Sequence, residues 1–213
     1  MSASLLTPRR VAFVAATLTA ALAITACGAS SNSTVAAPNS ASSTTGAPVG
    51  PAATGPHNSD DIAFAADMTP HHTQAVMMAD MALRTSKNAE ILALARAIKS
   101  GQNPEINTMK GWLRGWGAPA AGGGHGMSSM QSGPMMSGMM SDQQMQQLSG
   151  ATGVAFDRLW IAMMSAHHTG AIQMARTEQA VGQNPEAKTL AEQIIKAQNA
   201  ELITMTALSK TLS

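Results

Sequence analysis

The chain has 213 residues, of which 45% are hydrophobic and only 3% aromatic, and its formal charge is +1 at pH 7. Residues that favour strands are scarce, whereas Ala, Met, Leu and Gln are abundant, which argues against a β-sandwich or β-barrel and predicts an all-α fold. With 12% charged residues, the chain offers no basic patch for nucleic acid. Its single Cys cannot form an internal disulfide or a Cys-based zinc site, so any metal must be bound by His, Met, Asp or Glu.

Residues 1–26 have the layout of a secretory signal. Arg9 and Arg10 precede an apolar run over residues 11–24 that is too short to span a bilayer comfortably. The following Ile-Thr-Ala-Cys resembles the bacterial lipobox, in which the Cys is acylated and becomes the mature N-terminus. We expect a lipid anchor on Cys27 and a location at the extracytoplasmic face of the cell membrane. The alternative is an ordinary signal peptide cut nearby, and both predict export.

Two stretches have too few large apolar residues to bury a core. Residues 27–58 consist mainly of Ser, Thr, Ala, Pro, Gly and Asn, and we predict that they form a disordered tether. Residues 117–150 are rich in Gly, Ser, Gln and Met, and we predict a linker without regular structure. The folded domain should therefore span residues 59–213 and be built from the segments 59–116 and 151–212.

These two segments are copies of each other. With a constant offset of 96 residues, Met68–Met109 aligns without a gap with Met164–Met205, and 17 of the 42 aligned residues are identical. Apolar residues recur at steps of three and four in two stretches of each copy, which predicts two helical hairpins. Two hairpins that cover each other's apolar faces make a four-helix, ferritin-like bundle. Pro70 and Pro104 fall inside predicted helices, so we expect a kink there, or a helix that restarts with Thr69 as its N-cap.

The residues with metal-binding chemistry repeat with the helices. Placing the hairpin turns near residues 86–87 and 182–183 sets His71 opposite Gln102 and Met68 opposite Glu105, and the second copy repeats this arrangement with His167, Gln198, Met164 and Glu201. Buried imidazole and carboxylate groups need partners, which a metal ion or a hydrogen-bonded polar layer would supply. The predicted metal ligands are Met68, His71, His72, Met78, Glu105 and Met109 in the first copy, and Met164, His167, His168, Met174, Glu201 and Met205 in the second.

Copper fits this mixture of donors best. Thioether sulfur binds hard ions poorly and suits Cu(I), while imidazole also suits Cu(II), so we favour Cu(I) and keep Cu(II) possible. The linker adds further donors, which we expect to capture copper loosely: His125, Met127, Met130, Met135, Met136, Met139, Met140 and Met145. Three alternatives stay open. The Met side chains are core filler, Glu105 and Glu201 only hydrogen-bond the His side chains, or the linker is a plain spacer.

The doubled motif resembles a known family. The pattern Phe64-x3-Met68-x2-His71-His72-x2-Ala75-x2-Met78-Ala79, its repeat from Trp160, and Gln102-x2-Glu105-x3-Met109 are similar to the bacterial ferritin-like family of domains of unknown function that includes the periplasmic copper-binding protein CopM. The resemblance implies a four-helix bundle, export, and a role in copper binding and resistance. It carries a metal role to Met68, His71, His72 and Met78 and to their copies Met164, His167, His168 and Met174.

We therefore predict a lipoprotein that is not an enzyme and that buffers, sequesters or hands on copper ions. Two other classes remain. One is a helical lipoprotein that binds a protein partner without metal, and the other is a ferritin-like redox enzyme. The enzyme class is disfavoured because the chain has no Glu-x-x-His motif of the kind that di-iron bundles use.

Overall fold

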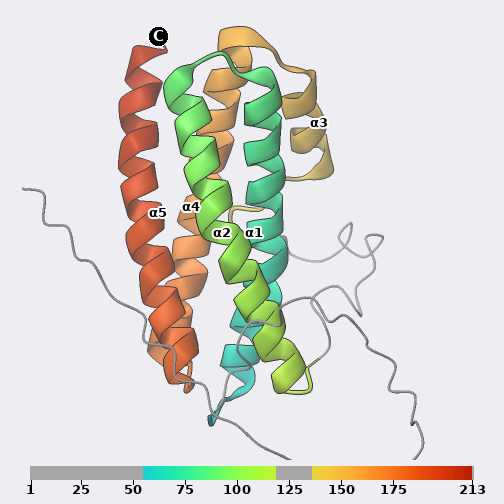
Figure 1. Ribbon diagram of the computed structural model, residues 1–213, viewed down its shortest axis with the longest axis vertical. Coiled ribbons are helices and arrows are strands. Elements are labelled where there is room, and N and C mark those ends of the chain that lie inside the picture. Colours follow the sequence, from blue (N-terminus) through green and yellow to red (C-terminus); the bar gives the residue numbers. More distant parts are fainter. Residues whose placement is uncertain (1–54, 119–135, 213) are drawn as a thin grey trace, which may run out of the picture. The chain divides into compact units, whose positions relative to one another are not determined.

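The computed structural model describes residues 55–118 and 136–212. Their regular structure is helical throughout, with α1 at Ser59–Thr85, α2 at Ala89–Gly115, α3 at Asp142–Gly150, α4 at Gly153–Val181 and α5 at Pro185–Thr211. Helix α1 packs chiefly against α2, α4 chiefly against α5, and the α1–α4 contact joins the two hairpins (Figure 1). The predicted all-α bundle of two hairpins is thus confirmed. The predicted signal peptide and Cys27 lie outside the described residues.

The helix starts follow from the local sequence. Asn58 begins α1 with a capping box that includes Asp61, and Asn88 and Asn184, which are copies of each other, cap α2 and α5 through their side-chain oxygens. Pro185 occupies the first turn of α5, where its missing N–H costs no hydrogen bond. Each cap satisfies backbone N–H groups that have no partner within the helix.

Of the two alternatives for the prolines, a helix that restarts at Thr69 is wrong. Helix α1 runs through Pro70 and α2 runs through Pro104, so no new helix starts at Thr69, whose hydroxyl donates to the carbonyl oxygen of Ala65 at 2.7 Å. The expected lack of regular structure over 117–150 is also wrong for residues 142–150, because a capping box at Ser141 starts α3 and Leu148 buries its side chain fully.

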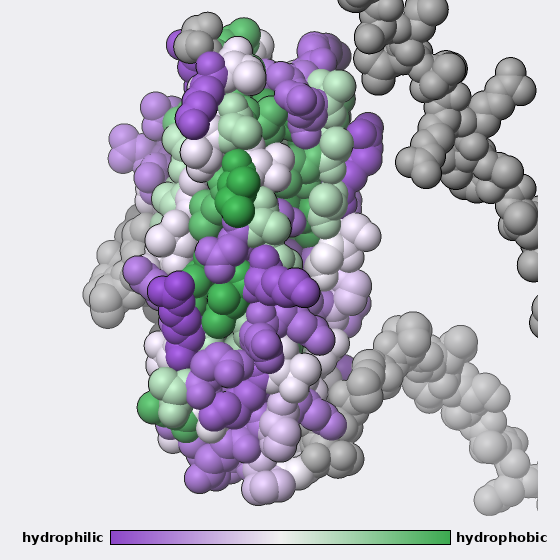
Figure 2. Space-filling view, turned by 90° about the vertical axis from the view of Figure 1, so that its left-hand side faces the viewer, coloured by the Kyte–Doolittle hydropathy of each residue, from purple (hydrophilic) through white to green (hydrophobic). Residues whose placement is uncertain are grey.

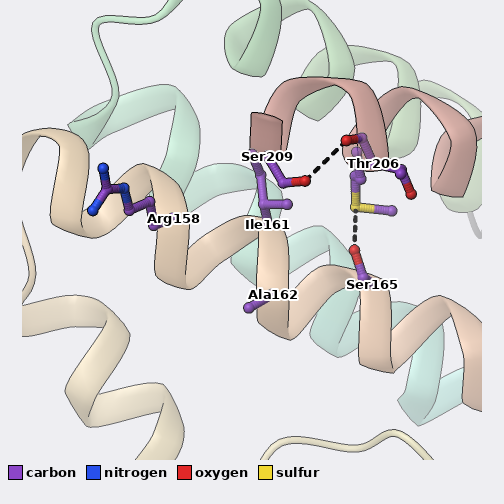
Figure 3. Close-up of a pocket in the computed structure, with 7 residues that line it drawn as sticks. Arg158, Ile161, Ala162, Ser165, Thr206 and Ser209 are labelled. Atoms are coloured by element: carbon purple, nitrogen blue, oxygen red, sulfur yellow. Dashed lines mark hydrogen bonds between the residues drawn. The ribbon is translucent and has the colours of Figure 1, made fainter. Parts of the chain in front are cut away.

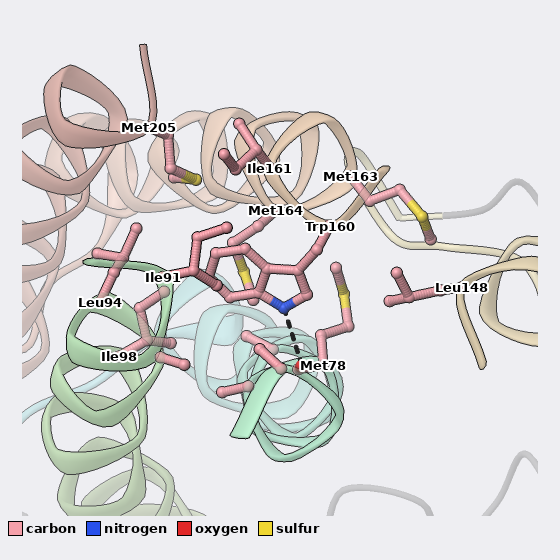
Figure 4. Packing of buried hydrophobic residues seen from close by; sticks show 14 of the residues in the cluster. Met78, Ile91, Leu94, Ile98, Leu148, Trp160, Ile161, Met163, Met164 and Met205 are labelled. Atoms are coloured by element: carbon pink, nitrogen blue, oxygen red, sulfur yellow. Dashed lines mark hydrogen bonds between the residues drawn. The ribbon is translucent and has the colours of Figure 1, made fainter. Parts of the chain in front are cut away.

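The apolar core consists of two clusters. The Trp160 cluster, drawn in Figure 4, combines the second half of α1 and the start of α2 with the first half of α4 and the end of α5. The Trp112 cluster combines the first half of α1 and the end of α2 with the second half of α4 and the start of α5. Both hairpins therefore contribute to each cluster, and neither hairpin has a core of its own.

A buried carboxyl pair ties α1 to the turn between α4 and α5. Asp61 accepts hydrogen bonds from the backbone N–H groups of Asn58, Gln183 and Asn184. Burial acts to raise the pKa of Asp61, but these N–H groups outweigh it and lower the pKa. Burial first, and the neighbouring Asp61 next, raise the pKa of Glu178 to about 8, and this side chain is only 1% exposed.

The face turned to the viewer in Figure 2, on the α5 side of the bundle, is mainly hydrophilic, with small separate hydrophobic patches. None of the helices in the described parts of the chain is long and apolar enough to cross a membrane.

Candidate metal site

Four His side chains form the centre of the bundle. His71 and His72 on α1 and His167 and His168 on α4 are all 0% exposed, and we call these four residues the imidazole layer. The rings of His71 and His167 face each other with centroids 3.8 Å apart and planes at 41°. The duplicated motifs therefore meet each other in the core.

Three of these four rings each have one nitrogen in a hydrogen bond. The Nε2–H groups of His72 and His168 donate to the carboxylates of Glu105 at 2.9 Å and Glu201 at 2.6 Å, and that of His71 donates to the carbonyl oxygen of Ser137 at 3.1 Å. These oxygens accept, so Nε2 carries a proton, and in the neutral imidazole Nδ1 keeps its lone pair. Ligating imidazoles in proteins usually have this arrangement, with the second nitrogen bound to a carboxylate or a carbonyl.

The remaining nitrogens have no partner. Nδ1 of His71, His72 and His168 and both ring nitrogens of His167 are buried without a hydrogen bond in the described parts of the chain. The amide groups of Gln102 and Gln198, each nearly fully buried, also keep unpaired atoms. Buried polar atoms in proteins are nearly always paired, so this concentration of unpaired donors and acceptors favours a bound group at the layer.

The two central imidazoles are neutral at physiological pH. Desolvation, followed by the neighbouring His side chains, lowers the pKa of His71 to about 4, with the Ser137 carbonyl acting in the opposite direction. The same causes lower the pKa of His167 well below its ordinary value. A neutral imidazole has the lone pair that metal binding requires.

The Met side chains border the layer in two sets. Met68, Met109 and the half-buried Met174 belong to the Trp112 cluster, whereas Met164, Met205 and Met78 belong to the Trp160 cluster. Each Met of one set is the repeat copy of a Met in the other set. The two copies of each Met therefore lie at opposite ends of the imidazole layer. Each set takes residues from both hairpins.

Met205, which is itself fully buried, also borders a groove. A pocket of about 240 Å³ between α4 and α5 has Met205 in its lining, and Ser165 Oγ donates to Met205 Sδ at 3.4 Å (Figure 3). In the same cluster, Trp160 Nε1 donates to the carbonyl oxygen of Met78 at 2.8 Å and links α4 to α1 (Figure 4).

The sequence-based register is wrong by about one helical turn for the Glu side chains. It set Glu105 opposite Met68 and Glu201 opposite Met164, but these carboxylates bind His72 and His168. Side chains on a helix lean toward its N-terminus, which on α2 and α5 carries them toward the hairpin turn. The alternative that Glu105 and Glu201 hydrogen-bond the His side chains therefore describes the observed geometry.

Sequence reasoning missed Ser137 and Gln74. Ser137 was assigned to the linker, but its carbonyl contacts the imidazole layer, and Gln74 binds the backbone of Met140. One signal was present: at an aligned position of the repeat, Gln74 is matched by Gly170. Residues 119–135 of the linker, including His125, Met127, Met130 and Met135, lie outside the described residues.

The donor set fits a soft metal better than a hard one. In residues 55–118 and 136–212, no group of three or more His, Cys, Asp or Glu side chains is arranged to hold a metal ion. A complete coordination shell at the imidazole layer would thus need thioether sulfur, which suits Cu(I).

Comparison with known proteins places the chain in a family. The model of the family described as "Domain of unknown function (DUF305)" matches residues 61–209. The chain belongs to the DUF305 family. No curated protein sequence matches this DUF305 protein significantly.

Solved structures agree with the family assignment. A DUF305 protein from Streptomyces coelicolor is 30% identical with a TM-score of 0.65, and the match covers 72% of this chain and 94% of that one. A DUF305 fragment from Deinococcus radiodurans is 26% identical with a TM-score of 0.63, covering 74% and 99%. CopM in its Cu(II)-bound form is 33% identical with a TM-score of 0.60, covering 72% and 97%. CopM also has Cu(I)-bound, Ag-bound and apo structures, so the family resemblance of the motifs is confirmed.

Proposed function

We propose that this DUF305 protein binds copper, with Cu(I) favoured, at the imidazole layer. The observation that supports this most is the set of unpaired Nδ1 atoms on buried imidazoles whose other nitrogens are held by a carboxylate or a carbonyl. The two Met sets supply the soft donors that this layer lacks. The copper-bound structures of the similar protein CopM support the same metal.

The residues proposed to hold the ion divide by role. Nδ1 of the imidazole layer and sulfurs of the Met sets bind the metal, while Glu105 and Glu201 orient their His side chains through Nε2–H. Because these two carboxylates are engaged in that way, we assign them to positioning and not to direct ligation. Neutral ligands leave the charge of a bound ion uncompensated, which favours a monovalent ion in a buried site.

We propose a non-catalytic role in buffering, sequestering or handing on copper, at the extracytoplasmic face of the membrane with Cys27 lipid-anchored. The support for the location is the signal and lipobox pattern of the sequence. Replacing Cys27 by Ser tests it: the protein should move from the membrane fraction to the soluble fraction of its own cells. An unchanged membrane fraction would reject the lipid anchor.

Anaerobic titration with Cu(I) tests the metal site. The mature chain, carrying Cys27→Ser for solubility, should bind Cu(I) more tightly than Met-containing peptides do, and the double variant His71→Ala/His167→Ala should lose that binding. Met77→Leu is the control, because Met77 is 52% exposed and belongs to neither Met set. Binding no tighter than that of the peptides would reject the proposal.

A further inference from the structure

Residues Met136–Met140 form a short strap that leads into α3. The strap begins with a β-turn in which the N–H of Met139 donates to the carbonyl oxygen of Met136 at 3.0 Å. Gly138, the third residue of that turn, has φ +81°, a conformation that favours glycine. The turn therefore presents the carbonyl of Ser137 in a defined direction.

Polar contacts hold the strap on both hairpins. The side-chain amide of Gln74 on α1 donates to the carbonyl oxygen of Met140 at 2.8 Å and accepts from its N–H at 2.7 Å. Ser137 Oγ donates to Gln173 Oε1 on α4 at 2.7 Å. These groups can exchange their partners for water when the strap undocks. His71 Nε2–H then loses the carbonyl of Ser137 and needs water as its partner.

The strap packs so closely on α4 that Gly138 and Gly170 have no room for a side chain. A Cβ on Gly170 would lie 1.8 Å from the carbonyl oxygen of Ser137, and a Cβ on Gly138 would lie 2.6 Å from that of Ala166. Gly170 is the copy of Gln74, so the two halves have diverged at one position, where one residue binds the strap and the other makes room for it.

At the strap, only a short segment of chain lies between the imidazole layer and solvent. Ser137 is itself exposed, yet its carbonyl oxygen contacts Nε2 of the fully buried His71. One thickness of chain thus separates this imidazole from solvent. Met136 and Met139, both half-buried, flank Ser137 and Gly138 in the chain.

We propose that the strap Met136–Met140 is the gate of the imidazole layer: docked, it covers His71, and undocked, it opens the path by which Cu(I) enters and leaves. This regulation rests on the proposed copper binding. Met140 is buried in the Trp160 cluster and anchors the α3 end of the strap, whereas polar contacts hold the rest. Local opening of so short a segment requires less free energy than separating packed helices, so the strap opens before the bundle does. Gate opening then limits the rate of metal exchange.

Two variants should displace the strap from α4, one by a substitution on α4 and one by a substitution in the strap itself. Gly170→Ala pushes the Ser137 carbonyl away from α4, and Gly138→Ala combines the clash with Ala166 with a strained φ. Because Ala favours helices more than Gly, Gly170→Ala is compatible with a folded α4. The matched controls are Gly101→Ala, a helical position with no atom within 4 Å of the new Cβ, and Gly117→Ala, which has φ +66° and equally open space.

The first measurement needs no metal. Diethyl pyrocarbonate modifies accessible neutral imidazoles, and mass spectrometry of the apo mature chain gives the rate for each His. Modification of His71 should accelerate about tenfold or more in both strap variants and stay at the wild-type rate in both controls, with the partly exposed His57 as internal reference. Equal His71 rates in all five proteins would overturn the gate, whether or not the protein binds copper.

The second measurement follows Cu(I) transfer from the loaded chain to a chromogenic chelator under anaerobic conditions. In the wild type the release rate should become independent of chelator concentration, and this limiting rate should rise about tenfold or more in Gly170→Ala and Gly138→Ala. Release that is no faster in the strap variants would reject the gate while leaving copper binding intact. A wild type that takes up no Cu(I) would reject the proposed function, and His71 modification would then decide on the gate alone.

Discussion

The buried carboxyl of Glu178 should make the stability of the bundle depend on pH. Its pKa is raised from 4.5 to about 8 in the folded chain, so the folded state binds a proton that the unfolded state has released. Stability from this group is fully present below pH 4.5 and falls as the pH rises, by about 1.4 kcal/mol per pH unit, until the pH passes the folded pKa. At pH 7 the loss amounts to about 3 kcal/mol.

Glu178→Gln removes this ionisation while keeping the shape of the side chain. We expect the variant to match the wild type near pH 4.5 and to exceed it by about 3 kcal/mol at pH 7, which raises the melting temperature by about 6 to 12 °C in a domain of this size. Far-UV circular dichroism melts between pH 4.5 and 8.5 measure the difference.

Burial, as the largest cause, and three neighbouring charged groups set the size of this effect, and a control isolates it. Asp61 and Asp60 act to raise the pKa of Glu178, and Lys188 acts to lower it. Glu192→Gln is the control, because Glu192 is an exposed carboxyl on α5. If wild type and Glu178→Gln lose stability in parallel as the pH rises, the buried carboxyl is not the cause and the reasoning is wrong.

Three further predictions concern single side chains. Trp160→Phe removes the indole N–H that the carbonyl of Met78 accepts in addition to its helical hydrogen bond, and urea unfolding should show a loss of about 0.5 to 1.5 kcal/mol. Glu105→Gln weakens the hold on His72 Nε2–H, so Cu(I) affinity measured by chelator competition should fall about 10- to 100-fold, with the thermal unfolding transition retained. Leu148→Ala removes the fully buried anchor of α3, and we expect a loss of about 2 to 5 kcal/mol in urea unfolding if α3 belongs to the cooperative unit; an unchanged midpoint would show that α3 unfolds independently.

The repeat made most of the fold predictable. A constant offset of 96 residues aligns the two His pairs and also the helix caps Asn88 and Asn184. Periodicity and caps are local properties of the sequence, so they identified the hairpins. That the His pairs face each other also followed, because two amphipathic hairpins must bury the same stripe.

The strap was not predictable by those rules. Its docking uses main-chain groups of Ser137 and Met140, and a main-chain carbonyl leaves no mark in composition or periodicity. Residues 136–141 are also too short and too rich in small and flexible side chains to predict an element. The divergence between Gln74 and Gly170 was visible, but its meaning depends on a third segment that alignment of the two copies does not contain.

The direction in which side chains lean explains the error in the register. Counting from the hairpin turn places backbones at the right level within about one helical turn. A Glu reaches several ångströms beyond its Cα, and this brought Glu105 to His72 instead of Met68. Counting residues from the hairpin turn therefore predicts at which height along the bundle a site lies. It does not predict which side chains hydrogen-bond each other there.

The contact of His71 with its own copy His167 bears on how such a chain can arise. A surface that meets its own duplicate in this way is self-complementary, as in an isologous dimer about a two-fold axis. A shorter ancestor with one hairpin could build the same centre by pairing two identical subunits. Joining the subunits in one polypeptide freed each half to mutate alone, and Gln74 and Gly170 are a difference that a dimer of identical subunits could not encode.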